Sequence, residues 1–283
     1  MSTDKFTTRE VYSPLKIAMD VANRYGEIPQ VMAVVLGGSH SVQRADSVSD
    51  IDLYVYSSEE IPHDARYNLA ASMGKDVEIN NQFWENGDEW IDAESSFHID
   101  VTFRNTKWIE EQLDRVLKHH EASLGYTTAL WYNVLNSNLL VDHEGWFSKL
   151  QTKAKQPYPD ELREAIIRKN HRVLRRSLSS YYYQIRLAVS RKDPVSINHR
   201  VAALLASYFD IVLAVNLVLH PGEKQLLTLV DEQCKRKPDN MRIHVNQLLK
   251  MIAQDDMQVI RTTDLLLDGL DAFLKAEKLD KIL

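Results

Sequence analysis

Two aspartates separated by one residue, Asp50 and Asp52, are the residues whose types and spacing most clearly predict chemistry. They open a predicted strand, so both carboxylates share one face while Ile51, Leu53 and Val55 point to the core. Two carboxylates held this close repel each other unless a cation lies between them. Mg²⁺ suits the position, because it binds one or two protein carboxylates and completes its shell with water and phosphate oxygens. The pair therefore predicts a Mg²⁺ site for a phosphate-bearing ligand.

A glycine turn upstream supplies the second half of such a site. Gly37, Gly38 and Ser39 follow the apolar run 31–36 and stand ten residues before the aspartates. Glycines let the backbone approach a phosphate and turn its N–H groups outward, and the Ser39 hydroxyl adds a donor. The competing interpretation is an ordinary hairpin with an acidic edge.

The pattern Gly-Ser, ten residues, Asp-x-Asp resembles the signature of the DNA polymerase beta-like nucleotidyltransferase superfamily. Within it, the two-domain antibiotic nucleotidyltransferases (kanamycin, streptomycin/spectinomycin, lincosamide) and the minimal nucleotidyltransferase antitoxins look most similar. The segments 82–85 (Gln-Phe-Trp-Glu) and 220–224 (His-Pro-Gly-Glu-Lys) are also similar to bacterial proteins known only as nucleotidyltransferase-like.

The resemblance implies a role for each residue of the signature. Asp50 and Asp52 would hold Mg²⁺, and Gly38 and Ser39 would cradle the triphosphate of an NTP. Ser49 matches a serine that faces phosphate in some of the antibiotic enzymes; its alternative role is that of a turn residue capping the loop.

Asp100 is the third carboxylate of the predicted site. It lies on a strand over 97–103, where Ile99 and Val101 face the core and His98 shares the polar face with Asp100. The resemblance implies either a metal ligand shared with the first two aspartates or the general base that takes the acceptor proton. The streptomycin-type enzymes carry Glu here, so the shorter Asp fits a ligand better than a base. A solvated aspartate is the alternative, with Asp76 and Glu78 as other sources of a carboxylate, and a lone histidine such as His98 is more often structural.

Lys224 is the predicted cation of the second half of the chain. It follows Pro221-Gly222, where a helix is expected to begin, and helix N-termini attract anions. A lysine there could reach a phosphate of the NTP, although it could equally be a solvated side chain. Arg168, Arg172 and Arg175 could line an anionic cleft, but such a run is more often a solvated face.

The elements that position these residues predict an α+β fold. We expect a mixed-sheet nucleotidyltransferase domain over 1–155 and an all-α helical bundle, forming a substrate cleft, over 156–283. The predicted strands are 31–36, 50–56, 76–80 and 97–103, and the first-domain helices are 14–25, 64–73, 106–118 and 126–137. The predicted bundle helices are 160–192, 195–219, 223–234, 239–254 and 262–276.

Composition excludes several classes of protein. A net charge of −6 over 283 residues argues against a general nucleic-acid binder. The single cysteine, Cys234, allows no internal disulfide and no Cys-based zinc site, so a cytoplasmic location without a secretory signal is expected. The run 201–219 is apolar, but Asp210 in its middle favours a buried bundle helix over a membrane span.

The expected activity is therefore Mg²⁺-dependent transfer of an NMP, AMP from ATP, to a hydroxyl of a small-molecule acceptor. The first alternative is a protein adenylyltransferase that modifies a partner. The second is a non-catalytic nucleotide-binding module.

Overall fold

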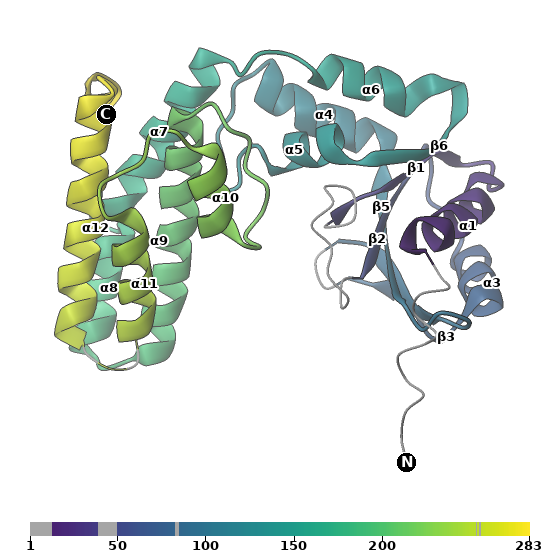
Figure 1. The fold of residues 1–283 in the computed structure, drawn as a ribbon, viewed down its shortest axis with the longest axis horizontal. Helices are drawn as coiled ribbons and strands as arrows, with labels where there is room; N and C mark the ends of the chain where they lie inside the picture. Colours follow the sequence, from purple (N-terminus) through teal and green to yellow (C-terminus); the bar gives the residue numbers. More distant parts are fainter. Residues whose placement is uncertain (1–12, 39–49, 83–84, 253, 255) are drawn as a thin grey trace. The chain divides into compact units, whose positions relative to one another are not determined.

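The computed structural model of the chain describes residues 13–38, 50–82, 85–252, 254 and 256–283. Two compact units divide the chain, each with its own core. The first comprises residues 1–113 and 133–156, and the second comprises residues 114–132 and 157–283. The first holds a β-sheet and the second is helical (Figure 1), so the predicted α+β class is confirmed. The assignment of catalysis to 1–155 and of substrate contact to 156–283 stays a prediction.

Within the described residues, the strands form one mixed sheet in the order β3-β4-β5-β2-β1-β6. Neighbours β2 and β5 run parallel, and every other neighbouring pair is antiparallel. The strands are β1 (Val31–Leu36), β2 (Ile51–Ser57), β3 (Gly74–Asn81), β4 (Gly87–Asp92), β5 (His98–Asn105) and β6 (Asn138–Asp142).

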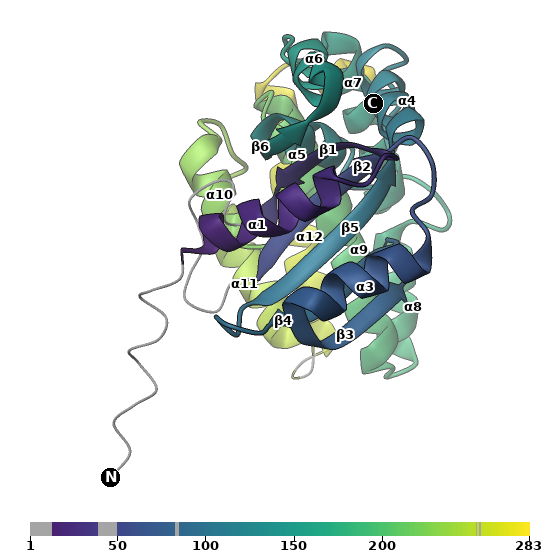
Figure 2. The ribbon, with the colours of Figure 1, turned by 90° about the vertical axis from the view of Figure 1, so that its right-hand side faces the viewer.

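Two helices cover one face of this sheet, as Figure 2 shows: α1 (Pro14–Gly26) packs on β1, β2 and β6, and α3 (His63–Met73) packs on β3 and β4. The core beneath them contains the apolar side chains of the central strands, among them Ile51, Leu53, Val55, Ile99 and Val101. The predicted alternation along β2 and β5 is confirmed, and the aspartates therefore lie on the opposite face.

The remaining helices of the first half connect strands or follow them. They are α4 (Thr106–Leu117), α5 (Ala129–Asn136), the short 3₁₀ turn η1 (His143–Gly145) and α6 (Trp146–Ala154).

The helical unit is built around its longest helix, α9 (Pro194–Val215), which packs against α7 (Asp160–Arg175) and α8 (Tyr181–Ser190). Helix α11 (Met241–Met251) packs against α12 (Asp256–Ala276), and α12 also contacts α8 (Figure 1). The unit is completed by α10 (Leu226–Gln233) and the 3₁₀ turn η2 (Asp280–Ile282).

Helix α9 is the one helix of the described residues that is long and apolar enough to cross a membrane. Most of that apolar window, 61%, is buried inside the unit. Asp210 in its middle accepts hydrogen bonds from the Thr127 hydroxyl at 2.6 Å and the Asn170 amide at 3.2 Å. Asp210 is thus paired inside the protein, and α9 is the core helix of its unit, as the prediction of a buried bundle helix required.

The prediction of one helix over 160–192 is wrong. Helix α7 ends at Arg175, and α8 begins only at Tyr181. The segment between them contains Ser177, Ser179 and Ser180, and serine side chains compete with helical backbone hydrogen bonds. Leu178 in the same segment is 97% exposed, so its side chain makes no packing contact that would favour a helical conformation there.

Candidate active site

Asp52 and Asp100 are neighbours on two adjacent strands. In the parallel pair β2–β5, Asp52 is the register partner of Asp100, and the next partners on the same face are Tyr54 and Thr102. Partners in register point to the same face of a sheet, so the two carboxylates lie side by side on the face away from α1 and α3. The structure therefore brings together the second and third predicted carboxylates.

Burial and neighbouring charges raise the pKa of Asp100. Its pKa rises to about 6, first because the carboxyl group is partly buried and then because Asp52 and Glu89 are negatively charged. His98 acts in the opposite direction. A raised carboxyl pKa indicates a site in which negative charge is already crowded, and a bound cation would relieve that crowding.

The glycine turn lies against the Asp52 carboxylate. Gly38 has φ +57°, a conformation that glycine adopts without strain, and a Cβ built on it would overlap Oδ2 of Asp52. The Gly37 N–H donates a hydrogen bond to the Asp52 carbonyl oxygen at 2.9 Å. The glycine turn and the Asp52 carboxylate are therefore in direct contact, and the role of Gly38 at a triphosphate stays a prediction.

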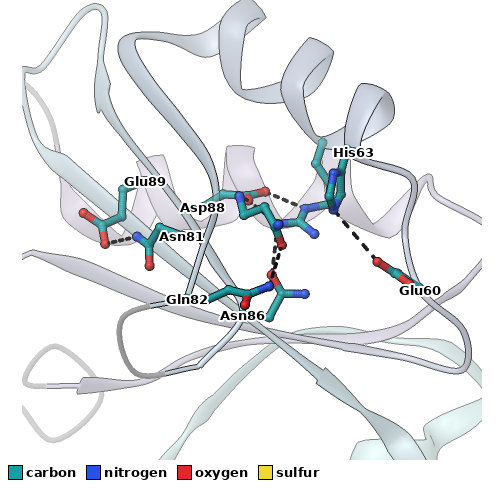
Figure 3. A network of polar contacts seen from close by, with 9 residues as sticks. Glu60, His63, Asn81, Gln82, Asn86, Asp88 and Glu89 are labelled. Carbon is teal, nitrogen blue, oxygen red and sulfur yellow. Dashed lines mark hydrogen bonds and ion pairs between the residues drawn. The ribbon is translucent and has the colours of Figure 1, made fainter.

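Asp50 comes directly before β2 and is exposed. Its carboxylate lies 3.2 Å from Nδ1 of His98, and the other ring nitrogen of His98 lies 3.2 Å from Oε2 of Glu89. Glu89 is the register partner of Asp100 across the antiparallel pair β4–β5. Its other carboxylate oxygen accepts a hydrogen bond from the Asn81 amide (Figure 3). Glu89, Asp100 and Asp52 therefore form a row across three strands, with His98 bridging Asp50 and Glu89.

Sequence reasoning missed Glu89 because β4 shows no apolar alternation. Asp88 lies on the opposite, buried face of β4 and pairs with Arg66 of α3, whose Nε donates to Asp88 Oδ2 at 2.8 Å. Figure 3 shows Asp88 and Glu89 in separate sets of contacts. The signal that could have found Glu89 is its two-residue spacing from Ile91, which puts the two side chains on one face of β4.

A cavity of about 190 Å³ opens at the other end of β2 and β5. Its lining includes Ser57, Glu60, Arg66, Asn86 and Arg104, and none of the predicted site residues lines it. The carboxylates lie at the end of the strands where β2 begins, so the chemistry and this cavity are separate features.

The carboxylates fit a cation that takes only part of its shell from protein. Among the described residues, no group of three or more His, Cys, Asp and Glu side chains is arranged to hold a metal ion. Mg²⁺ at an NTP site commonly uses one or two carboxylates, with phosphates and water supplying the rest. Asp50 and Asp52 match that donor set in type and number.

The other predicted residues have different outcomes. Ser39 and Ser49 lie outside the described residues. Lys224 is exposed and lies in a turn, so the prediction that it begins a helix is wrong. Gln225 adopts φ 54°, which interrupts helical geometry, and α10 begins at Leu226.

The predicted arginine row of α7 is largely engaged within its own unit. Arg175 forms ion pairs with Asp264, Asp268 and Asp271 of α12. Arg168 contacts Glu164 and donates to the Ile282 carbonyl oxygen. These contacts favour the structural interpretation of the row.

Solved structures similar to this chain include a nucleotidyltransferase-like protein from Exiguobacterium sibiricum, at 11% identity and a TM-score of 0.43, covering 92% of this chain and 78% of that one. A CCA-adding enzyme from Thermotoga maritima, complexed with tRNA, matches at 10% identity and a TM-score of 0.32, covering 94% and 82%. A CCA-adding enzyme in complex with ATP matches at 13% identity and a TM-score of 0.28, covering 95% and 83%. No protein-family model and no curated protein matches the sequence.

At identities of 10–13% and TM-scores of 0.43 or below, these structures describe a likeness alone, and the functional proposal rests on the residues of this chain.

Proposed function

We propose that the protein is a Mg²⁺-dependent nucleotidyltransferase that moves an NMP, AMP from ATP, to a hydroxyl of a small-molecule acceptor. The observation that carries the proposal is the register of Asp52 with Asp100, together with Gly38 packed against the Asp52 carboxylate. Two carboxylates beside a glycine turn provide what a metal-bound triphosphate needs: anionic ligands for the ion and a backbone that phosphate can approach.

Asp50 and Asp52 would hold the Mg²⁺, which neutralises the charge that develops on the phosphate oxygens as pyrophosphate leaves. Gly38 and Ser39 would contact the triphosphate, with Ser49 as a further phosphate contact. The acceptor hydroxyl oxygen bonds to the α-phosphorus as the bond to the β-phosphate oxygen breaks.

Asp100 is proposed as the base that takes the proton of the acceptor hydroxyl. Its pKa is raised to about 6 in the metal-free protein, which supports a group that can exchange a proton near neutral pH. The alternative role is that of a third Mg²⁺ ligand beside Asp50 and Asp52.

The test is to incubate the protein with each NTP, Mg²⁺ and a panel of aminoglycosides, lincosamides and cell extract. We expect pyrophosphate release and an acceptor whose mass has grown by one NMP. Asp100→Asn should lower turnover by about 10²–10³ while the protein stays folded, because the side chain lies on the polar strand face. Label on a protein instead would identify a protein adenylyltransferase, and nucleotide binding without pyrophosphate release would identify a binding module.

A further inference from the structure

The ring of Tyr54 packs against the glycine turn. Tyr54 lies two residues after Asp52 on β2 and on the same strand face. A Cβ built on Gly37 would overlap the ring atoms Cε2 and Cδ2 of Tyr54. The ring therefore limits where the Gly37 backbone can lie, and through it where Gly38 meets the Asp52 carboxylate.

The guanidinium of Arg104 packs on the ring of Tyr54. Its guanidinium carbon lies 4.1 Å from the centroid of the Tyr54 ring. In the β2–β5 register Arg104 is the partner of Tyr56, so the guanidinium reaches back along the sheet toward the strand ends that carry Asp52 and Asp100. The Arg104 side chain is buried, with 5% of its surface exposed.

Three further hydrogen bonds fix the guanidinium. Nε and Nη2 donate to the two carboxylate oxygens of Glu85, at 2.8 and 2.7 Å, and Nη1 donates to Oδ1 of Asn133 at 2.9 Å. A bidentate arginine–carboxylate pair of this kind fixes the orientation of the guanidinium. A buried ion pair adds little net folding stability compared with apolar packing of the same volume. We therefore expect the pair between Arg104 and Glu85 to matter for the geometry that it fixes.

We infer that Tyr54 and Arg104 are positioning residues of the nucleotide site: they hold the backbone of Gly37 so that the turn stays in contact with Asp52. Neither side chain touches the substrate in this account. The inference rests on the proposed function, because the effect is expected in nucleotide binding.

The test compares Tyr54→Leu and Tyr54→Phe with a matched control, Tyr25→Leu, by calorimetric titration of Mg²⁺-ATP. Tyr25 is a buried tyrosine of α1 on the opposite face of the sheet, and its ring packs on Phe103 with ring centroids 5.7 Å apart. We expect Tyr54→Leu to bind about tenfold more weakly, because small displacements of a site have large effects. Tyr54→Phe keeps the ring and should bind as the wild type does. Tyr25→Leu should melt at a lower temperature and, while folded, bind normally.

Arg104→Lys provides a second and independent variant. Lysine keeps the positive charge but cannot form the bidentate hydrogen bonds to Glu85 or stack a planar guanidinium on the Tyr54 ring. Weaker binding of Mg²⁺-ATP is therefore again expected. If Tyr54→Leu does not fold, this variant decides the question. Wild-type affinity in Arg104→Lys and in any folded Tyr54→Leu, or an equal loss of affinity in Tyr25→Leu, would overturn the inference. A wild-type protein that binds no Mg²⁺-ATP would instead contradict the proposed function.

Discussion

The carboxylate of Asp52 occupies the space that a side chain on Gly38 would need. The two residues are 14 positions apart in the sequence, and the pairing of β1 with β2 brings them together. Contact between the turn and the carboxylate is the geometric basis of the proposed triphosphate site.

Gly38→Ala should therefore lower Mg²⁺-ATP affinity and turnover by about 10²-fold, because the new methyl group displaces the carboxylate. Gly145→Ala is the matched control: Gly145 also has positive φ, +65°, but open space around its position. Both variants should lose about 1–2 kcal/mol of folding free energy through backbone strain. Thermal denaturation should therefore show similar losses of stability, and only the kinetics and the Mg²⁺-ATP affinity should separate the two variants. Equal activity in both would contradict the role of the contact between Gly38 and Asp52.

Glu89→Gln should lower the pKa of Asp100. Burial is the first cause of the raised value and the negative charges of Asp52 and Glu89 come next, so removing the Glu89 charge should shift the midpoint down from about 6, by roughly half a unit. NMR titration of the Asp100 side-chain carboxyl carbon in metal-free protein measures this directly.

Glu78→Gln is the control for that titration. Glu78 is the register partner of Glu89 on β3 and is exposed, and it is not among the charges that raise the Asp100 pKa. An Asp100 midpoint that is the same in both variants would mean that Glu89 does not belong to the carboxylate row in solution.

How far the sequence predicts this site depends on the strand that carries each residue. Strands β2 and β5 alternate apolar and polar residues, so the shared face of Asp52 and Asp100 is predictable from a period of two. Their alignment in register is a tertiary fact that no local pattern encodes. Strand β4 escaped prediction because the carboxylates of Asp88 and Asp92 are buried, the first paired with Arg66 and the second bonded to Ser95.

Other misses in the fold have similar causes. Strand β6 is a short edge strand, Asn138–Asp142, with few residues over which a period can be recognised. The break between α7 and α8 and the late start of α10 depend on turn residues, the serines near Leu178 and Gln225 at positive φ. Local backbone preferences at such positions compete with the helical period and prevailed here.

The stability of the helical unit should fall as pH rises from about 4 to about 7. Burial raises the pKa of Asp210 to about 7, against the hydrogen bonds from Thr127 and Asn170. A folded-state pKa above the unfolded value means that this contribution is present at low pH and lost as pH rises through 7. Asp210→Asn cannot titrate, so its melting temperature should depend less on pH over that range. Equal slopes in wild type and variant would show that Asp210 does not titrate there.

The most direct test of the metal and nucleotide site is a calorimetric titration of ATP into the wild-type protein, with and without Mg²⁺, and into Asp52→Asn with Mg²⁺. ATP brings about four negative charges to a place already occupied by carboxylates, so binding needs a cation between them. We predict measurable affinity only for the wild type with Mg²⁺, and strongly reduced affinity in the other two titrations. Equal affinity in all three would contradict the assignment of Asp50 and Asp52 as the carboxylates that hold the ion.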